Sequence, residues 1–179
     1  MIPVGYMAKR VCGKLDWLQA PQVLDVYSVS PCISEDFADF INYWKHNGYW
    51  LFDSPEIIRN VAQANAISLD GTALFYYEVF ENEFLDGKWK AFAPEASFLT
   101  NVLLPLKKQL EGFDVVTFYS KTSPECSPLS CNHLAKDIPT NAHCLLKSFE
   151  EAQTALESGA FRQCEPGPYR IFAVYSVDW

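Results

Sequence analysis

The residues of this chain best suited to chemistry are thiols and imidazoles near its C-terminal end. Cys126, Cys131 and His133 lie close together, and His143 and Cys144 follow shortly after them. Thiolates and imidazoles are the ligands that zinc prefers, and four of them at tetrahedral distance form a structural site. The spacing does not give two Cys-x-x-Cys pairs, so we expect no bound metal. If a metal is bound, the candidate ligands are Cys126, Cys131, His133 and Cys144.

The same residues include the parts of a cysteine nucleophile. A reactive thiol needs a nearby base or a helix N-terminus to lower its pKa. The candidates are Cys126 or Cys131 as nucleophile, His133 or His143 as base, and Asp114 or Asp137 as the group orienting the base. Many chains of this size contain such a set, and buried free cysteines also act as small hydrophobic residues. The catalytic hypothesis is therefore secondary.

A third group of candidate residues is aromatic and lies between Tyr43 and Phe52. Trp and Tyr are preferred anchors of protein interfaces, with charged residues at the rim. Trp44 continues the apolar face of a predicted helix, and regularly spaced aromatic residues usually pack in the core. Tyr43 falls off that face, and Tyr49 and Trp50 point to opposite sides of an extended chain. We therefore expect at least one of these three to reach the surface.

The negative charge of the chain is concentrated in one stretch. The 179 residues carry 14 Lys and Arg against 22 Asp and Glu, a formal charge of −8. Residues 35–86 hold ten of the acids and two of the bases, so the remainder is neutral. A negative field repels nucleic acid, whereas an acidic surface attracts a basic protein partner. The carboxylates expected to meet that partner are Glu78, Glu81 and Glu83, although acidic stretches are often only solvated faces.

These candidates must be positioned by helices and strands that the sequence also predicts. A capping serine marks the start of each of three helices: Ser34, Ser54 and Ser148. Apolar residues at helical spacing follow each of these serines. A further helical stretch at residues 97–110 is interrupted by Pro105.

Strands alternate with the predicted helices. Residues 72–80 and 169–177 are apolar at both odd and even positions, so both faces of these strands would be apolar. We therefore expect them to be buried in the middle of a sheet. Asp86-Gly87 marks a hairpin. Shorter strands are predicted at residues 22–29, 49–52, 113–119 and 143–146.

The amino-acid sequence shows no internal repeat and no linker. The predicted fold class is α+β, with a single mixed or antiparallel sheet covered by about three helices. Residues 1–179 are expected to form one globular domain.

The cysteine count and the apolar runs bear on the compartment. No basic region followed by an apolar core opens the sequence, and no apolar run approaches the length of a membrane span, so we expect neither secretion nor membrane insertion. A chain of this length closes its core without disulfides, so its six cysteines are expected to be free thiols in the reducing cytoplasm.

Two stretches of the chain resemble a family of small uncharacterised bacterial proteins. They are Ser123-Pro-Glu-Cys-Ser-Pro-Leu-Ser-Cys-Asn132 and Cys164-Glu-Pro-Gly-Pro-Tyr-Arg-Ile-Phe172. The resemblance implies a bacterial cytoplasmic protein. It carries over no catalytic residue.

Together these features favour a non-catalytic acidic binding protein of the inhibitor, immunity or accessory type. It would present residues 35–86 to a basic protein partner. No cofactor motif is present, so no cofactor, nucleic acid or membrane is expected to bind. The alternatives are a Cys/His-dependent enzyme that uses residues 126–144 and a zinc-stabilised module. The oligomeric state is left open.

Overall fold

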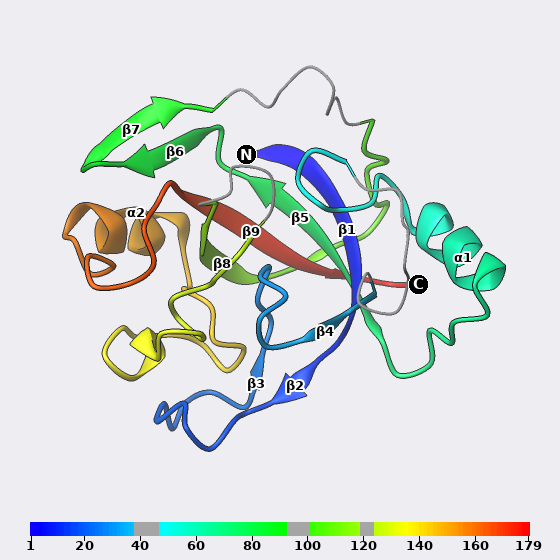
Figure 1. Ribbon diagram of the computed structural model, residues 1–179, viewed down its shortest axis with the longest axis horizontal. Helices are drawn as coiled ribbons and strands as arrows, with labels where there is room; N and C mark the ends of the chain where they lie inside the picture. Colours follow the sequence, from blue (N-terminus) through cyan, green and yellow to red (C-terminus); the bar gives the residue numbers. More distant parts are fainter. Residues whose placement is uncertain (38–46, 93–100, 119–123) are drawn as a thin grey trace.

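The fold is built on one antiparallel sheet, which crosses the middle of Figure 1 and is strongly twisted. The computed structural model describes residues 1–37, 47–92, 101–118 and 124–179. The seven-stranded sheet has the order β4-β1-β5-β9-β6-β7, and β8 also pairs with β9. Its strands are β1 (Ile2–Arg10), β4 (Glu35–Asp36), β5 (Ala73–Val79), β6 (Asn82–Leu85), β7 (Lys88–Ala91), β8 (Gln109–Thr117) and β9 (Tyr169–Val177). A separate two-stranded sheet pairs β2 (Cys12–Gly13) with β3 (Asp25–Val26).

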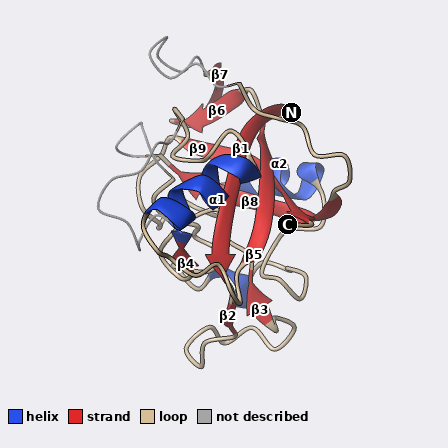
Figure 2. Cartoon of the chain, turned by 90° about the vertical axis from the view of Figure 1, so that its right-hand side faces the viewer, coloured by secondary structure: helices blue, strands red, loops and turns tan. Residues whose placement is uncertain are grey.

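Two α-helices in the described ranges begin where the capping serines predict. In α1 (Pro55–Ala64), the Ser54 hydroxyl accepts from the amide of Ile57. In α2 (Phe149–Glu157), Ser148 accepts from Glu151 in the same way. Figure 2 shows α1 in front of the sheet beside β1, with α2 at a separate place behind it. Neither helix has the length and apolar character needed to cross a membrane.

The predicted fold class is wrong in its helix content. The sheet is antiparallel, and the described residues contain two short α-helices in place of about three that cover it. The helix expected after Ser34 does not begin there, because Glu35 and Asp36 pair with Arg10 and Lys9 to form β4. Its expected continuation, residues 38–46, lies outside the described residues. Residues 101–107 form no helix, and the end of the fourth helical prediction, at 109–110, belongs to β8.

Several strand predictions are confirmed and others are not. β5, the β6–β7 hairpin at Asp86-Gly87 and the central strand β9 lie where they were expected. Of the strand predicted at residues 22–29, only β3 is formed. Residues 49–52 and 143–146 form turns instead, and each turn makes one isolated bridge to a neighbouring strand. β1 was not predicted, because a bulge between Pro3 and Gly5 interrupts its alternation of buried and exposed residues.

The structure contains an internal repeat that the sequence does not reveal. Each half consists of a strand with a bulge, an asparagine-centred turn, a serine-capped helix and a central strand: β1, α1 and β5 in the first half, and β8, α2 and β9 in the second. The buried residues of the helices occupy the same positions, Ile58 and Ala62 in α1 and Ala152 and Leu156 in α2. The turns read Asn47-Gly-Tyr-Trp-Leu-Phe-Asp-Ser-Pro-Glu56 and Asn141-Ala-His-Cys-Leu-Leu-Lys-Ser-Phe-Glu150. Only Asn, Leu, Ser and Glu are identical between the two turns, so the repeat leaves little trace in the sequence.

The two asparagines perform the same structural task. The amide nitrogen Nδ2 of Asn47 donates to the carbonyl of Val4 at 2.7 Å, and that of Asn141 donates to the carbonyl of Glu111 at 2.7 Å. These carbonyls belong to the bulges of β1 and β8. Each asparagine Oδ1 also accepts from two backbone amides of its own turn. Each asparagine side chain therefore fixes its turn against the bulged strand of its half, β1 or β8.

A glycine follows each bulge because the turn approaches the strand closely. Gly5 has φ +133° and Gly112 has φ +152°. A Cβ at either glycine would lie 2.7 Å from a carbonyl oxygen of the facing turn, that of Phe52 or Leu146. The same contact recurs in both halves, which supports a true duplication of the unit.

The two halves are related by an approximate twofold axis between β5 and β9. Tyr77 pairs with Val174, and these two residues occupy equivalent positions in their halves. The neighbouring pairs Tyr76–Tyr175 and Glu78–Ala173 lie on either side of it, and the twofold axis maps each of these two pairs onto the other. The axis is perpendicular to the sheet, since paired residues of antiparallel strands share a face.

The repeat predicts that both asparagines are structural. Asn47→Ala and Asn141→Ala should each lower the free energy of unfolding by about 2–4 kcal/mol, because each leaves several buried backbone groups without a partner. Chemical denaturation measures this change. The matched control is Asn60→Ala, an exposed position in α1, where the change should stay within about 0.5 kcal/mol. A small effect at Asn141 alone would show that the second half does not use the turn in this way.

Candidate functional site

Three cysteine thiols converge at one place in the described structure. The sulfur atoms of Cys32, Cys126 and Cys131 all lie within 4.8 Å of one another. Cys126 is buried, Cys131 is half-buried and Cys32 is exposed. We call these three residues the thiol cluster. Its members come from two segments that are far apart in the sequence.

Cys32 is held in the cluster by a turn that follows β3. The Ser30 hydroxyl accepts from the Cys32 amide at 3.1 Å and donates to the carbonyl of Glu125 at 2.7 Å. The Cys32 sulfur also lies 2.8 Å from that carbonyl. These contacts tie the segment before β4 to the segment that contains the other two cysteines.

Cys126 and Cys131 are placed by the end of β8 and by a helical turn. The amide of Thr117 donates to the Cys126 carbonyl at 2.8 Å, and the Thr117 hydroxyl accepts from the Cys126 amide at 3.2 Å. The Cys131 amide donates to the carbonyl of Ser127 at 2.8 Å, as in a turn of helix. This turn brings the Cys131 sulfur back toward Cys126.

The cluster lies beside a buried layer of polar groups. Lys9 is 1 % exposed, and its Nζ lies within 3.3 Å of five acceptors. These acceptors are the carbonyls of Ser28, Val29 and Ser30, the Ser34 hydroxyl and the Asp36 carboxylate. The layer therefore fixes the whole segment that leads to Cys32 against β1.

Asp114 provides the second half of this buried layer. Its carboxylate accepts from the Ser28 hydroxyl, from the Val29 amide at 2.9 Å and from the Ser127 hydroxyl. Burial raises the pKa of Asp114 to about 6, although these hydrogen bonds and Lys9 lower it in part. Ser28 and Ser127 flank the two cysteine segments, so one carboxylate fixes both of them.

The pKa values of the three thiols are shifted in different directions. Hydrogen bonds from Cys126 and Cys131 lower the pKa of Cys32. Hydrogen bonds to Cys131 and Cys32, together with burial, raise the pKa of Cys126. Cys131 accepts from Cys126, which lowers its pKa, but its bond to Cys32 and burial outweigh this and raise the pKa to about 11. By these directions Cys32 is the most acidic thiol of the cluster.

Apart from Asp114, which fixes the two cysteine segments, the other predicted metal and catalytic residues do not join this cluster. His133 Nδ1 lies 3.2 Å from the Trp17 carbonyl, and its ring packs on the Trp17 ring. Cys144 is buried in the Asn141 turn, and burial raises its pKa to about 12. Asp137 follows the 3-10 helix Leu134–Lys136. Of the predicted ligands, Cys126 and Cys131 come together, whereas no His, Asp or Glu of the described residues joins them in a three-ligand group.

His143 belongs to a different constellation. Its Nδ1 lies 2.6 Å from a carboxylate oxygen of Asp25, and its Nε2 lies 3.7 Å from Glu111. Its ring stacks on Tyr27 with a centroid separation of 4.1 Å. The carboxylates on both sides of the imidazole come from β3 and β8, so His143 joins the small sheet to the large one. In the described part of the chain, neither His133 nor His143 is hydrogen-bonded to a cysteine sulfur.

The predicted binding residues are scattered among different environments. Tyr49 is buried and Trp50 is 37 % exposed in a left-handed conformation, φ +57°. Glu81 is exposed. Tyr43 lies outside the described residues.

The other two predicted carboxylates make ion pairs with residues from outside the acidic stretch. Glu78 pairs with Lys108 and accepts from the hydroxyls of Tyr76 and Tyr175. Glu83 pairs with Arg170. Both carboxylates therefore already have structural roles within the fold.

The structure also adds residues to the site that sequence reasoning missed. Cys32 was counted among the cysteines, but nothing associated it with Cys126. Its signal was the Ser-Pro sequence before it, which also precedes Cys126 at Ser123-Pro124. Lys9 and Asp36 gave no signal, because burial of an ion pair depends on tertiary packing.

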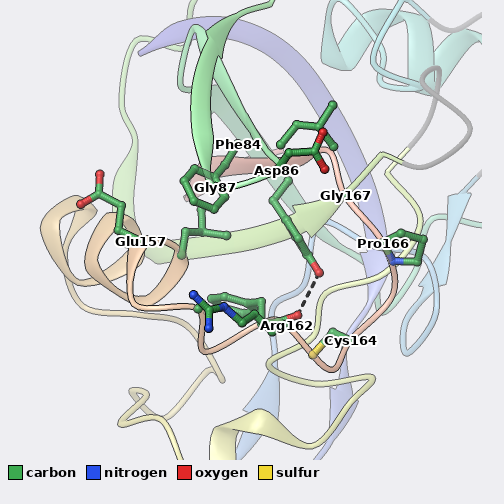
Figure 3. Close-up of a pocket in the computed structure, with 13 residues that line it drawn as sticks. Phe84, Asp86, Gly87, Glu157, Arg162, Cys164, Pro166 and Gly167 are labelled. Atoms are coloured by element: carbon green, nitrogen blue, oxygen red, sulfur yellow. Dashed lines mark hydrogen bonds between the residues drawn. The ribbon is translucent and has the colours of Figure 1, made fainter.

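A separate cleft lies between the β6–β7 turn and the end of α2, as Figure 3 shows. Its volume is about 390 Å³, and its labelled lining residues include Asp86, Glu157, Arg162 and Cys164. Burial raises the pKa of Cys164 to about 11, so this thiol is protonated at neutral pH. The cleft brings together no group of catalytic side chains comparable to the thiol cluster.

Comparison with known proteins gives no relative on which to base a function. No family model matches the chain, and neither a curated protein nor a solved structure is significantly similar to it. The function must therefore be argued from the geometry of the site.

The raised pKa of Asp114 predicts how stability depends on pH. Between about pH 4 and pH 6 the folded state keeps a proton that the unfolded state has released, so this group makes the free energy of unfolding fall as pH rises, by up to about 3 kcal/mol in total. Asp114→Asn removes this contribution. Denaturation at several pH values should show the difference between wild type and variant changing across this window.

Asp86→Asn, at the exposed turn between β6 and β7, is the matched control. Its stability should run parallel to that of the wild type throughout the same window. If Asp114→Asn also gave a parallel profile, the Asp114 pKa would not be raised in the folded protein.

Proposed function

We propose that the protein is a non-catalytic module that binds a thiophilic metal ion, zinc above all, through Cys32, Cys126 and Cys131. The observation that carries the proposal is the convergence of the three sulfur atoms within 4.8 Å of one another. The cluster brings together three thiols from two distant segments, and thiolate ligands select ions such as Zn²⁺ and Cu⁺.

The distances support an ion at the centre of the cluster. Zinc–sulfur bonds of about 2.3 Å in tetrahedral geometry place two sulfur atoms roughly 3.8 Å apart. Sulfur atoms within 4.8 Å of each other reach this separation through small side-chain rotations. Each sulfur that binds the ion does so as a thiolate, and the positive charge of the ion stabilises all three.

The surroundings support a structural use of the ion. Hydrogen bonds through Ser30, Asp114 and Thr117 already hold the two cysteine segments in place. An ion would fasten the segment between β3 and β4 to the segment after β8. The exposed position of Cys32 leaves a fourth coordination position on the solvent side. A reducing compartment such as the bacterial cytoplasm would keep the ligands free of disulfides.

The geometry gives less support to the two other hypotheses. A cysteine enzyme needs a base beside its nucleophile, and neither imidazole is bonded to a thiol in the described residues. Recognition of a basic partner through residues 35–86 stays a prediction. It is weakened by the internal ion pairs of Glu78 and Glu83.

Metal analysis of the native protein tests the proposal. Protein purified without chelator should contain about one equivalent of zinc, and Co²⁺ substituted for it should show the charge-transfer absorption of thiolate ligands. Cys32→Ser should lower the metal content below about a tenth of an equivalent under dialysis, because two thiolates hold the ion poorly. Competition with a Cu⁺ chelator shows whether copper is preferred.

Cys12→Ser is the matched control, since Cys12 is also partly exposed but lies outside the cluster. It should keep the full equivalent. The proposal is wrong if the reduced protein takes up neither zinc nor Cu⁺, or if Cys12→Ser loses as much metal as Cys32→Ser.

A further inference from the structure

The thiol cluster combines one accessible sulfur with two shielded ones. Cys32 is exposed, whereas Cys131 is half-buried and Cys126 is buried. The three sulfur atoms lie within 4.8 Å of one another. A small reagent that arrives from solvent therefore meets Cys32 first, and any group formed on its sulfur has a second thiol beside it. Accessibility and a neighbouring thiol are features of cysteines that are oxidised reversibly.

The other three cysteines lack this combination. Cys12, Cys144 and Cys164 are free thiols, and in the described part of the chain none of them belongs to the group of converging sulfur atoms. Cys144 is also buried, whereas Cys12 and Cys164 are half-buried. Oxidation chemistry that depends on the cluster should therefore leave these three thiols unchanged.

Backbone contacts favour Cys131 over Cys126 as the thiol that reacts with Cys32. Cys126 is held on both sides by Thr117, whose amide donates to the Cys126 carbonyl and whose hydroxyl accepts from the Cys126 amide. The Cys126 sulfur also lies 3.6 Å from Oδ1 of Asn132. Cys131 lies in a helical turn, where its amide donates to the carbonyl of Ser127. Cys131 can therefore approach Cys32 with less loss of hydrogen bonding.

We propose that Cys32 and Cys131 form a site of oxidative modification, at which a hydroperoxide converts the two thiols to a disulfide. With hydrogen peroxide, the Cys32 sulfur attacks one oxygen and the O–O bond breaks. The Cys32 proton leaves with the other oxygen as water, and a sulfenic acid remains on Cys32. The Cys131 sulfur then attacks the Cys32 sulfur, and the sulfenic hydroxyl leaves with the Cys131 proton as a second water. Both sulfur atoms are oxidised and both peroxide oxygens are reduced.

The surrounding hydrogen bonds allow the fold to persist after this reaction. The disulfide joins the segment between β3 and β4 to the segment after β8. The Asp114 carboxylate already holds the same two segments through the hydroxyls of Ser28 and Ser127. Neither hydrogen bond involves a cysteine, so the reaction leaves both in place.

The disulfide also regulates the metal site, and this part of the inference rests on the proposed function. Zinc binds cysteine as a thiolate. Oxidation of Cys32 and Cys131 removes two of the three thiolates and leaves Cys126 alone. A hydroperoxide therefore releases the ion, and reduction of the disulfide restores the site.

Peptide mapping of the reduced, metal-free protein after treatment with hydrogen peroxide tests the disulfide. The number of thiols that can be alkylated should fall from six to four and return to six with a dithiol reductant. Trypsin places Cys32 on residues 15–45, whereas Cys126 and Cys131 share residues 122–136. These two peptides should be recovered as a linked pair, and its fragmentation should place the bond at Cys131.

Serine variants identify the reacting thiols. Cys131→Ser should form less than about a tenth of the linked pair that the wild type forms, and Cys126→Ser should form as much as the wild type. Cys12→Ser is the matched control, since Cys12 lies outside the cluster, and it should react as the wild type does. The disulfide is overturned if peroxide leaves six free thiols, if the bond joins other cysteines, or if Cys131→Ser still forms the linked pair. The map of the wild type decides the matter even if a variant does not fold.

Zinc separates this inference from the proposed function. In protein loaded with one equivalent of zinc, peroxide should release the ion in step with the linked pair, as a zinc-sensitive dye measures. Protein that binds zinc but yields no linked pair overturns the present inference and leaves the metal site. Protein that yields the linked pair but never takes up zinc overturns the proposed function and leaves the disulfide. Retention of zinc by the disulfide-linked protein overturns the regulation.

Discussion

The ammonium group of Lys9 is the interaction around which this fold is organised. It is buried at the end of β1, where an isolated cation would be strongly unfavourable, and it is stable there because three carbonyls, a hydroxyl and a carboxylate surround it. To supply those acceptors, the chain between β3 and β4 must wrap around the Lys9 side chain. The wrapped segment then carries Cys32 to the thiol cluster. Loss of the ammonium would leave the Asp36 carboxylate and the backbone carbonyls facing one another.

The duplicated frame explains where polar groups are tolerated. Lys9, Asp114 and Arg170 correspond by strand register to Val116, Met7 and Ala73 of the other half. Each buried polar residue thus has a small or apolar equivalent, so the frame itself does not require it. The asparagine turns, the glycines beside them and the capping serines are retained in both halves. The repeat supplies the common frame. Its asymmetric residues Lys9 and Asp114 hold the segments that carry the thiol cluster, and Arg170 is the third such residue.

The sequence predicts the parts of the fold that are decided locally. Ser54 and Ser148 identify both α-helices because a capping hydroxyl acts on amides within one turn. Asp86-Gly87 identifies its hairpin for the same reason. The helix expected after Ser34 fails because the Ser34 hydroxyl is instead held by Lys9 and Asp36, and the partner of Asp36 is distant in the sequence. Two of the three cluster cysteines were recognised because they lie close together in the chain, whereas Cys32 is brought to them only by tertiary contacts.

The distribution of charge also shows that a local stretch of sequence does not determine what its side chains contact in the fold. Residues 35–86 carry the net charge of −8, yet several of their carboxylates have cations from other parts of the chain. Lys9 pairs with Asp36, Lys108 with Glu78 and Arg170 with Glu83. Charge that is segregated along the sequence is thus partly neutralised in the fold, because β4 lies beside β1 and β6 lies beside β9, both from the neutral remainder. A local excess of acids therefore predicts an acidic surface only where the adjacent strands bring no bases. Here β1 brings Lys9 and Arg10, and β9 brings Arg170.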